Sequence, residues 1–475
     1  MSVASFAVAP QTAEACGGTF CDGGQGMPVD QTGENILFIS DATSVEAHIQ
    51  IQYDPNTNAQ DFAWLVPLTA VPEFSVGSDL LFQALLRGTV PTYGLNNNFC
   101  GGTTGTGGSP FLSEPDTPGS SGPEIVHNEV VGAFEVTVLT DDSAADLMTW
   151  LGENGYTQDP NAEPILQEYL DEGHLFAAFK LHNDSETSDI HPVVLRFESD
   201  EACVPLRLTR IAAGEDMDVR AFFLGNNRTV PTNYRHVLVN PLKLDWLNFA
   251  SNYKDVITLA VDAFMADGRA FVTEYAGTSD VVNTSGVFRP GWDGSVFSGL
   301  SPVAVVDTLT DQILMECFGD ECLFYHPLLE GLLAQHLPVP EGLLPGDFYS
   351  CLTCYEDLID AEAWGDGSGF AVAFDERIVV PGMHAVSLIE TWPYLTRLYT
   401  TISGHEMTED PMFHQNPSLQ DIPNIRQATR NYLCDGPYDE GDSVVTLPDG
   451  REVFIPADGS WPDFPDEMPW ELEVQ

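Results

Sequence analysis

Basic residues are scarce in this chain. Lysine and arginine together number 17, against 72 aspartates and glutamates, which gives a formal charge of −55. Only Lys180, Lys243 and Lys254 are lysines. A polyanion cannot neutralise phosphates, so the composition argues against nucleic acids and anionic membrane surfaces as partners. Such an acidic, lysine-poor surface indicates adaptation to high salt, because salt screens the repulsion between carboxylates. Calcium binding is the second explanation.

Long apolar runs are also missing. No run reaches the roughly 18 residues of a membrane span, so no transmembrane segment is predicted. The chain is not poor in core material, because 43% of its residues are hydrophobic and 10% are aromatic. This composition is typical of a folded protein and unlike that of a disordered acidic chain.

Several catalytic motifs are absent. No lysine follows a glycine, which excludes a P-loop, and no Gly-x-Ser-x-Gly elbow occurs. His405-Glu406 lacks the second histidine of a zinc-protease helix. Tyr355 follows Cys354, which excludes c-type haem attachment at that position. The sequence therefore identifies no reaction.

Calcium ligands are the next possibility in so acidic a chain. The segment Asp54–Asn58 resembles the start of a calcium loop, but Ala59 and Leu65 stand where glycine and the bidentate glutamate belong. The acidic segments Asp366–Ser368 and Asp439–Asp442 could supply weak ligands, although solvated acidic loops are commoner. No cofactor is predicted, and calcium stays an open alternative.

The first residues resemble the remnant of an export signal. Val3–Ala9 is apolar, and Ala13–Ala15 is a small-residue cleavage pattern directly before Cys16. We therefore expect residues 1–15 to be removed and the protein to be periplasmic, at the cell surface or extracellular. Cleavage before a cysteine leaves lipidation of Cys16 open as well.

The nine cysteines agree with export. Six occur as close pairs, and in an oxidising compartment such pairs are typical of disulfides. These pairs are Cys16 with Cys21, Cys317 with Cys322, and Cys351 with Cys354. A four-thiolate zinc site built from the last two pairs is the alternative, but the spacing of the first of them does not suit it. Cys100, Cys203 and Cys434 stand apart.

The pattern of the chain predicts an α+β fold. Residues 16–277 form a β-rich antiparallel domain with inserted helices and a flexible loop at 96–124, which is rich in glycine, serine and proline. Residues 278–435 form a smaller, mainly helical, disulfide-stapled region. Residues 436–475 form a hairpin at Pro448–Arg451 and an acidic tail. Within the helical region, Arg377–Val380 and Ala385–Glu390 suggest two short strands.

One strand shows a clear period of two. From Val45 to Tyr53, apolar residues alternate with Glu46, His48, Gln50 and Gln52. This alternation predicts a half-buried antiparallel strand, on whose polar face His48 is interpreted as solvated and not as a ligand.

The most suggestive polar group near the C-terminus is Arg397 with Glu406 and Asp410. Arg397 is embedded among Leu395, Leu398 and Tyr399, so a structural ion pair is the favoured interpretation.

Several segments together resemble a bacterial family known as domain of unknown function 2330. These are Ala15–Cys21, Pro28–Gln31, Ala47–Tyr53, Phe62–Pro67, Val71–Glu73, Arg269–Tyr275, and Tyr394–Thr400 with Glu406–Thr408 and Asp410–Pro411. The resemblance covers most of residues 15 to 413. It implies an exported envelope protein, and it supplies no catalytic residues to carry over.

Two functional hypotheses follow. The favoured one is a non-enzymatic exported protein of the cell envelope, disulfide-stabilised and salt-adapted, with a structural or recognition role and an envelope or extracellular partner. The alternative is a secreted hydrolase that uses a carboxylate pair in the β-rich domain, assisted by calcium.

Overall fold

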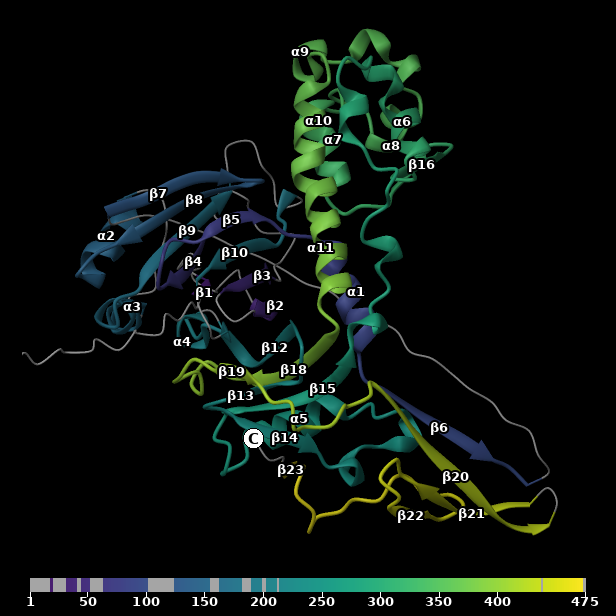
Figure 1. The fold of residues 1–475 in the computed structure, drawn as a ribbon. Helices are drawn as coiled ribbons and strands as arrows, with labels where there is room; N and C mark the ends of the chain where they lie inside the picture. Colours follow the sequence, from purple (N-terminus) through teal and green to yellow (C-terminus); the bar gives the residue numbers. More distant parts are fainter. Residues whose placement is uncertain are drawn as a thin grey trace, which may run out of the picture.

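Two β-sheets lie face to face across a shared hydrophobic core in the computed structural model of the protein (Figure 1). The structure describes residues 18–19, 31–40, 44–51, 63–100, 124–153, 162–181, 189–198, 202–211, 213–436 and 439–472. The predicted export signal at 1–15, Cys16, Cys21 and the segment Asp54–Asn58 lie outside these residues.

The central sheet has nine strands. In spatial order they are β23 (Trp470–Leu472), β14 (Arg235–Val239), β15 (Ala270–Thr278), β18 (Tyr394–Ile402), β12 (Ala213–Gly225), β2 (Gln31–Ser40), β3 (Val45–Ile51), β10 (Val193–Phe197) and β5 (Glu73–Val76). Most neighbours are antiparallel, but β2 pairs in parallel with β12, and β14 with β15. The sheet thus joins strands from both ends of the described chain.

The second sheet has five strands and covers one face of the first. Its order is β1 (Gly18–Thr19), β4 (Ala63–Leu68), β9 (Leu175–Leu181), β8 (Phe134–Thr140) and β7 (Glu124–Val131). Apolar residues that alternate along β2 and β3, such as Ile36 and Ala47, meet Trp64 and Phe179 of the second sheet in the core between them. This is the expected packing of two half-apolar faces.

Helices cover the outer face of each sheet. On the five-stranded sheet these are α2 (Ala144–Glu153), which Ser143 caps, and α3 (Ala162–Asp171). On the nine-stranded sheet they are α1 (Asp79–Thr89) and α11 (Val380–Thr391). The order of layers is therefore helix, sheet, sheet, helix.

Residues from about 288 to 379 form a helical lobe with its own hydrophobic core (Figure 1, top). Its elements are η7 (Gly294–Phe297), η8 (Pro302–Ala304), α6 (Val305–Asp311), β16 (Met315–Phe318), β17 (Glu321–Phe324), α7 (Leu329–His336), α8 (Pro345–Ser350), η9 (Leu352–Cys354), η10 (Glu356–Leu358), α9 (Ala361–Trp364) and α10 (Ser368–Phe374). Two disulfides lie within it. The expectation of an α+β fold with a smaller, disulfide-stapled helical region is confirmed.

One long helix connects this lobe to the central sheet, where the sequence pattern predicted two short strands. α10 continues through the π-helical turn η11 (Asp375–Val379) into α11, so Arg377–Val380 and Ala385–Glu390 are helical. The prediction was wrong because the helix packs against two cores, that of the lobe and that of the sheet. Its apolar residues therefore do not form the single stripe by which an amphipathic helix is identified in a sequence. Pro381 cannot donate the hydrogen bond expected inside a helix, which accounts for the local widening.

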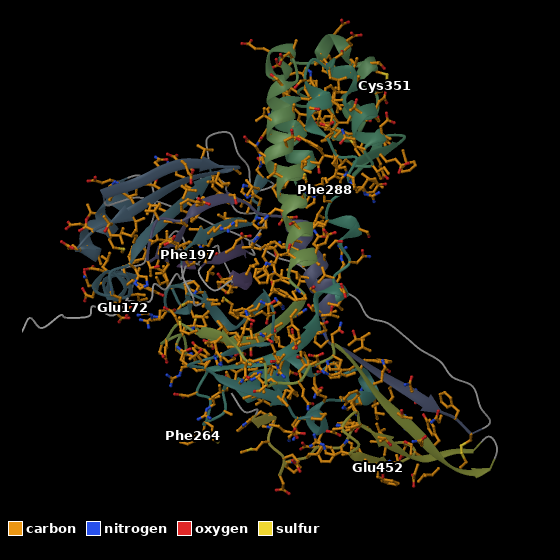
Figure 2. The ribbon with its side chains drawn as sticks, in the orientation of Figure 1. Glu172, Phe197, Phe264, Phe288, Cys351 and Glu452 are labelled. Carbon is orange, nitrogen blue, oxygen red and sulfur yellow. A yellow bond between two sulfur atoms is a disulfide. The ribbon has the colours of Figure 1, made fainter. Side chains whose placement is uncertain are left out.

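The same helix packs closely against the segment that enters the lobe. A Cβ atom at Gly382 would lie 3.1 Å from the carbonyl oxygen of Val287 and 3.3 Å from the Cβ of Phe288, whose ring lies beside α11 (Figure 2). The absence of a side chain at Gly382 allows this contact.

A β-ribbon extends from the other end of the central sheet. It comprises β22 (Glu452–Ile455), β21 (Asp439–Thr446), β20 (Ile425–Gly436) and β6 (Thr92–Asn98). The hairpin expected around Pro448–Arg451 joins β21 to β22. The loop expected at 96–124 is shorter at both ends, because Asn96–Asn98 pairs with β20 and Glu124 begins β7. Residues 101–123 lie outside the described chain.

Shorter elements fill the remaining connections. These are β11 (Ala202–Cys203), β19 (Met412–Gln415), β13 (Thr229–Pro231), α4 (Leu206–Thr209), η3 (Pro241–Lys243), η4 (Trp246–Asn248), α5 (Tyr253–Val261), η5 (Ser279–Val281) and η6 (Thr284–Gly286). No helix among the described residues has both the length and the apolar character that a membrane crossing requires.

The buried Glu34 on β2 generates a prediction about pH. Burial raises its pKa from 4.5 to about 8, and its Oε2 atom has no hydrogen-bond partner among the described residues. Because the folded state keeps a proton that the unfolded chain releases, stability is full below pH 4.5 and falls as the pH rises toward 8, by up to about 1.4 kcal/mol per pH unit.

We expect Glu34→Gln to remove this loss, so that the variant unfolds at higher urea than the wild type at pH 9 and similarly at pH 5. Glu452→Gln, at an exposed strand position (Figure 2), serves as the control. Parallel pH profiles for Glu34→Gln and the wild type would contradict the prediction.

Candidate functional site

The polar face of β3 is buried against the helices that cover the central sheet. Val45, Ala47 and Ile49 point into the core between the sheets, so Glu46 and His48 point to the opposite face, where α1 and α11 pack. His48 is only 1% exposed and Glu46 8%. The interpretation of His48 as solvated was wrong, because a helix more than 300 residues later in the chain covers this strand.

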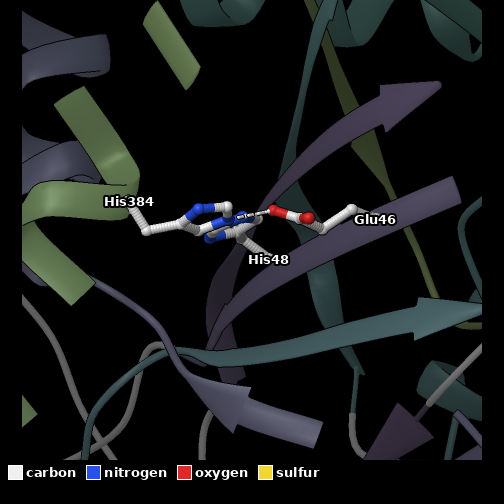
Figure 3. A group of neighbouring side chains, drawn as sticks. All are labelled: Glu46, His48 and His384. Carbon is white, nitrogen blue, oxygen red and sulfur yellow. Dashed lines mark hydrogen bonds and ion pairs between the residues drawn. The ribbon is translucent and has the colours of Figure 1, made fainter. Parts of the chain in front are cut away.

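That helix supplies a third group, His384 on α11. The Nε2 atoms of His48 and His384 lie 2.8 Å and 2.5 Å from the same carboxylate oxygen, Oε1 of Glu46. The two imidazole rings stack nearly parallel, with centroids 5.8 Å apart (Figure 3). The three side chains therefore converge from two elements, β3 and α11, that are distant in the sequence.

The electrostatics of the cluster keep Glu46 ionised. Burial alone would raise the pKa of its carboxyl, but the hydrogen bonds with His384 and His48 outweigh burial and hold that pKa well below its usual range. Burial lowers the pKa of His48, an effect that Glu46 partly offsets. Arg196 is the further charged group at the site, with its guanidinium 3.9 Å from Oε2 of Glu46 and its side chain 55% exposed.

The cluster offers three donor atoms to one point. Two imidazole nitrogens and one carboxylate oxygen lie within 4.8 Å of one another, and within the described ranges no other histidines, cysteines or carboxylates gather in a comparable metal-ligand group. Zinc takes these ligand types, and without an ion the same groups make charge-assisted hydrogen bonds between sheet and helix. Sequence reasoning missed the site. Glu46 and His48 carry the i, i+2 spacing of one strand face, but nothing in the sequence connects them to His384.

A second polar contact holds the same long helix. Arg377 on η11 donates to the backbone oxygen and to Oδ1 of Asp189, at 3.0 Å and 3.2 Å, just before β10. Gln335 of α7 donates to the other carboxylate oxygen of Asp189 at 2.6 Å. The helical lobe is thus attached to the central sheet by two polar anchors, Arg377 and His384, that lie seven residues apart on one helix.

Arg397 forms a structural ion pair, but its partner is neither Glu406 nor Asp410. Its Nε lies 2.5 Å from Oε2 of Glu274 on β15, although the two atoms are not aligned as a hydrogen bond, and both residues are buried. Tyr253 donates to the other oxygen of Glu274 at 2.9 Å. The order of strands in the sheet explains why Arg397 pairs with Glu274. β18, which carries Arg397, lies beside β15, whereas Glu406 and Asp410 follow β18 in a turn.

Asp410 instead binds Arg207. The arginine Nε donates to Oδ2 at 2.8 Å, its backbone N–H donates to Oδ1 at 2.8 Å, and Tyr169 also donates to Oδ2. Glu406 accepts the backbone N–H of Ser403. Burial and the charge of Glu406 raise the pKa of the nearby Asp262 to about 6. The Asp262 side chain remains exposed to solvent, so this pair is not the deeply buried carboxylate pair that the hydrolase hypothesis requires.

The cysteines of the helical lobe are joined in two disulfides. Cys317 pairs with Cys322 across the β16–β17 hairpin, and Cys351 pairs with Cys354 at η9. Their sulfurs are therefore not free for the alternative four-thiolate zinc site. A third disulfide, which spacing could not indicate, joins Cys100 after β6 to Cys434 on β20. Cys203 is disulfide-bonded too.

The acidic segments considered for calcium serve local structure. Asp366 accepts hydrogen bonds from the backbone and hydroxyl of Ser368, which forms a turn at the start of α10. Asp442 accepts the backbone N–H of Ala457.

Comparison with known proteins gives one match. A family model described as "Uncharacterized protein conserved in bacteria (DUF2330)" matches residues 10–289, which confirms the family resemblance noted in the sequence over that part of the chain. The segments at 394–411 that were also assigned to the resemblance lie beyond the matched residues. Searches of curated proteins and of solved structures gave no match. His384 lies beyond the matched residues, whereas Glu46 and His48 lie within them.

The ion pair of Arg397 and Glu274 generates a prediction about stability. Replacing Arg397 by methionine leaves the buried carboxylate of Glu274 without its cation, and we expect a loss of about 3–5 kcal/mol in the free energy of unfolding, measured with urea. The double variant R397M/E274M should recover much of that loss. The exposed Arg87→Met serves as the control and should change stability by less than about 0.5 kcal/mol. Equal, small effects of R397M and R87M would contradict the prediction.

Proposed function

The chain belongs to the DUF2330 family of uncharacterized proteins conserved in bacteria, and we propose that it acts outside the cytosol as a non-enzymatic protein of the cell envelope. Its role there is structural or recognition-related. Its folded parts are stabilised internally by disulfides, and buried ion pairs join segments that are distant in the sequence.

The state of the cysteines carries this proposal. All seven cysteines among the described residues are disulfide-bonded: Cys100, Cys203, Cys317, Cys322, Cys351, Cys354 and Cys434. Disulfides persist in oxidising compartments and are rare where thioredoxin and glutathione keep thiols reduced. The apolar stretch and small-residue pattern at the start of the sequence support the same compartment.

The charge supports a saline environment. With a formal charge of −55, carboxylates on the surface repel one another, and salt shortens the range of that repulsion from about 10 Å at 0.1 M to about 3 Å at 1 M. Few lysines are present to offset the repulsion.

The first prediction from this proposal concerns thiols. Protein isolated from its native host under alkylating, non-reducing conditions should show none of the seven described cysteines alkylated, and it should fractionate with envelope or extracellular material. After reduction all seven should react, which controls for access of the reagent. Alkylation of Cys317 or Cys351 without reduction, in protein recovered from the cytosolic fraction, would contradict the proposal.

The second prediction concerns salt. We expect the melting temperature to rise by at least about 5 °C between roughly 0.1 M and 2 M NaCl, because screening relieves repulsion in the folded state. KCl at equal ionic strength is the control and should act alike, since screening does not depend on the cation. A flat or falling melting temperature would exclude salt adaptation.

A further inference from the structure

We propose that Glu46, His48 and His384 bind one divalent transition metal ion, with zinc as the ion best suited to the site. This inference goes beyond an envelope location and a structural role, since it assigns a specific ligand to named side chains.

The donor set is the first argument. Two imidazole Nε2 atoms and Oε1 of Glu46 converge within 4.8 Å. Two histidines and one glutamate match zinc sites that keep a coordination position open for water. Calcium and magnesium prefer sites made of oxygen ligands alone, so the nitrogen donors select against both ions.

The second argument is geometric. Zinc bonds of about 2.0–2.1 Å in a tetrahedral arrangement place ligand atoms roughly 3.3 Å apart. The Nε2 atoms of His48 and His384 now lie 2.8 Å and 2.5 Å from the carboxylate oxygen. An ion at this point takes the place of the two Nε2 protons, which each neutral imidazole then carries on Nδ1. The two separations from Glu46 need to widen by less than about 1 Å, which small side-chain rotations of Glu46 and His384 can supply.

Burial is the third argument. His48 is buried, and its ring makes one hydrogen bond among the described residues, through Nε2 to Glu46. That one hydrogen bond does little to repay the removal of the His48 imidazole from water. A metal bond at its Nε2 would offset that cost.

Access and surroundings agree with this assignment. The side chain of His384 is 41% exposed while that of Glu46 is 10% exposed, so the cluster is open to solvent at His384. The formal charge of −55 favours cations near the protein as a whole. Arg196 opposes a cation, but its guanidinium is 3.9 Å from Oε2, the carboxylate oxygen that neither histidine contacts.

The occupied site would join β3 to α11 and so strengthen one of the two anchors of the helical lobe. The test uses the full chain after EDTA has removed bound metal. Zinc chloride is titrated into this protein in 1 M NaCl that also contains millimolar calcium and magnesium. The calcium and magnesium ions saturate weak carboxylate sites on the surface. We expect one zinc ion per chain by calorimetry. Cobalt in its place should give the visible absorption of a four- or five-coordinate site with nitrogen ligands.

Variants separate this site from adventitious binding. His384→Ala should weaken zinc binding by more than about 100-fold, since even partners outside the first coordination shell are worth 10–100-fold. Glu46→Gln, which keeps the side-chain volume, should also weaken it. His405→Ala, at an exposed histidine on another surface, should leave affinity unchanged.

Equal zinc affinity of His384→Ala and the wild type would overturn the proposal. The proposal would also be overturned if the wild-type protein bound no zinc in the presence of calcium. The three side chains would then form hydrogen bonds and no metal site. If a variant fails to fold, the cobalt spectrum of the wild type still decides, because oxygen-only coordination would exclude the histidines.

Discussion

Cations are so few in this chain that the position of each arginine constrains the fold. Three of the 14 arginines are buried, and each one joins segments far apart in the sequence. Arg397 lies against Glu274, Arg377 against Asp189, and Arg228 donates to the backbone oxygen of Gln420. A buried carboxylate without its cation is costly, whereas surface carboxylates stay solvated. At two of these junctions, Arg397 with Glu274 and Arg377 with Asp189, the arginine supplies the cation that a buried carboxylate requires.

The long helix formed by α10, η11 and α11 depends on the same principle. It carries apolar residues into two separate cores, and between them it presents Arg377 and His384 to acidic partners on the sheet side. Polar contacts at both points fix the rotation of the helix about its own axis, which apolar packing alone does not specify. The π-helical turn η11, which contains Arg377, lies within this anchored stretch. Such turns occur frequently at functional sites.

Local patterns were sufficient to predict much of the fold and little of the candidate site. The alternation along β3 and the hairpin at Pro448–Arg451 each depend on neighbouring residues, and both are present. The strands expected at Arg377–Val380 and Ala385–Glu390 are helical because two cores cover that helix. The partners of Arg397, Cys100 and His48 are separated from them by 123, 334 and 336 residues. The periodicity of the sequence cannot predict such contacts, because they arise from tertiary packing between distant segments.

The two proposals support each other through the chemistry of ligands. A protein that works in an oxidising compartment loses thiolate as a metal ligand when its cysteines form disulfides, as the seven described cysteines do here. Imidazole is then the remaining side chain that binds zinc in preference to calcium and magnesium. This preference matters because an acidic surface also attracts calcium and magnesium. Histidine is scarce, at 11 residues in 475, whereas carboxylates are abundant. Selectivity at the cluster therefore depends on the two imidazoles, and Glu46 supplies the charge that holds them together.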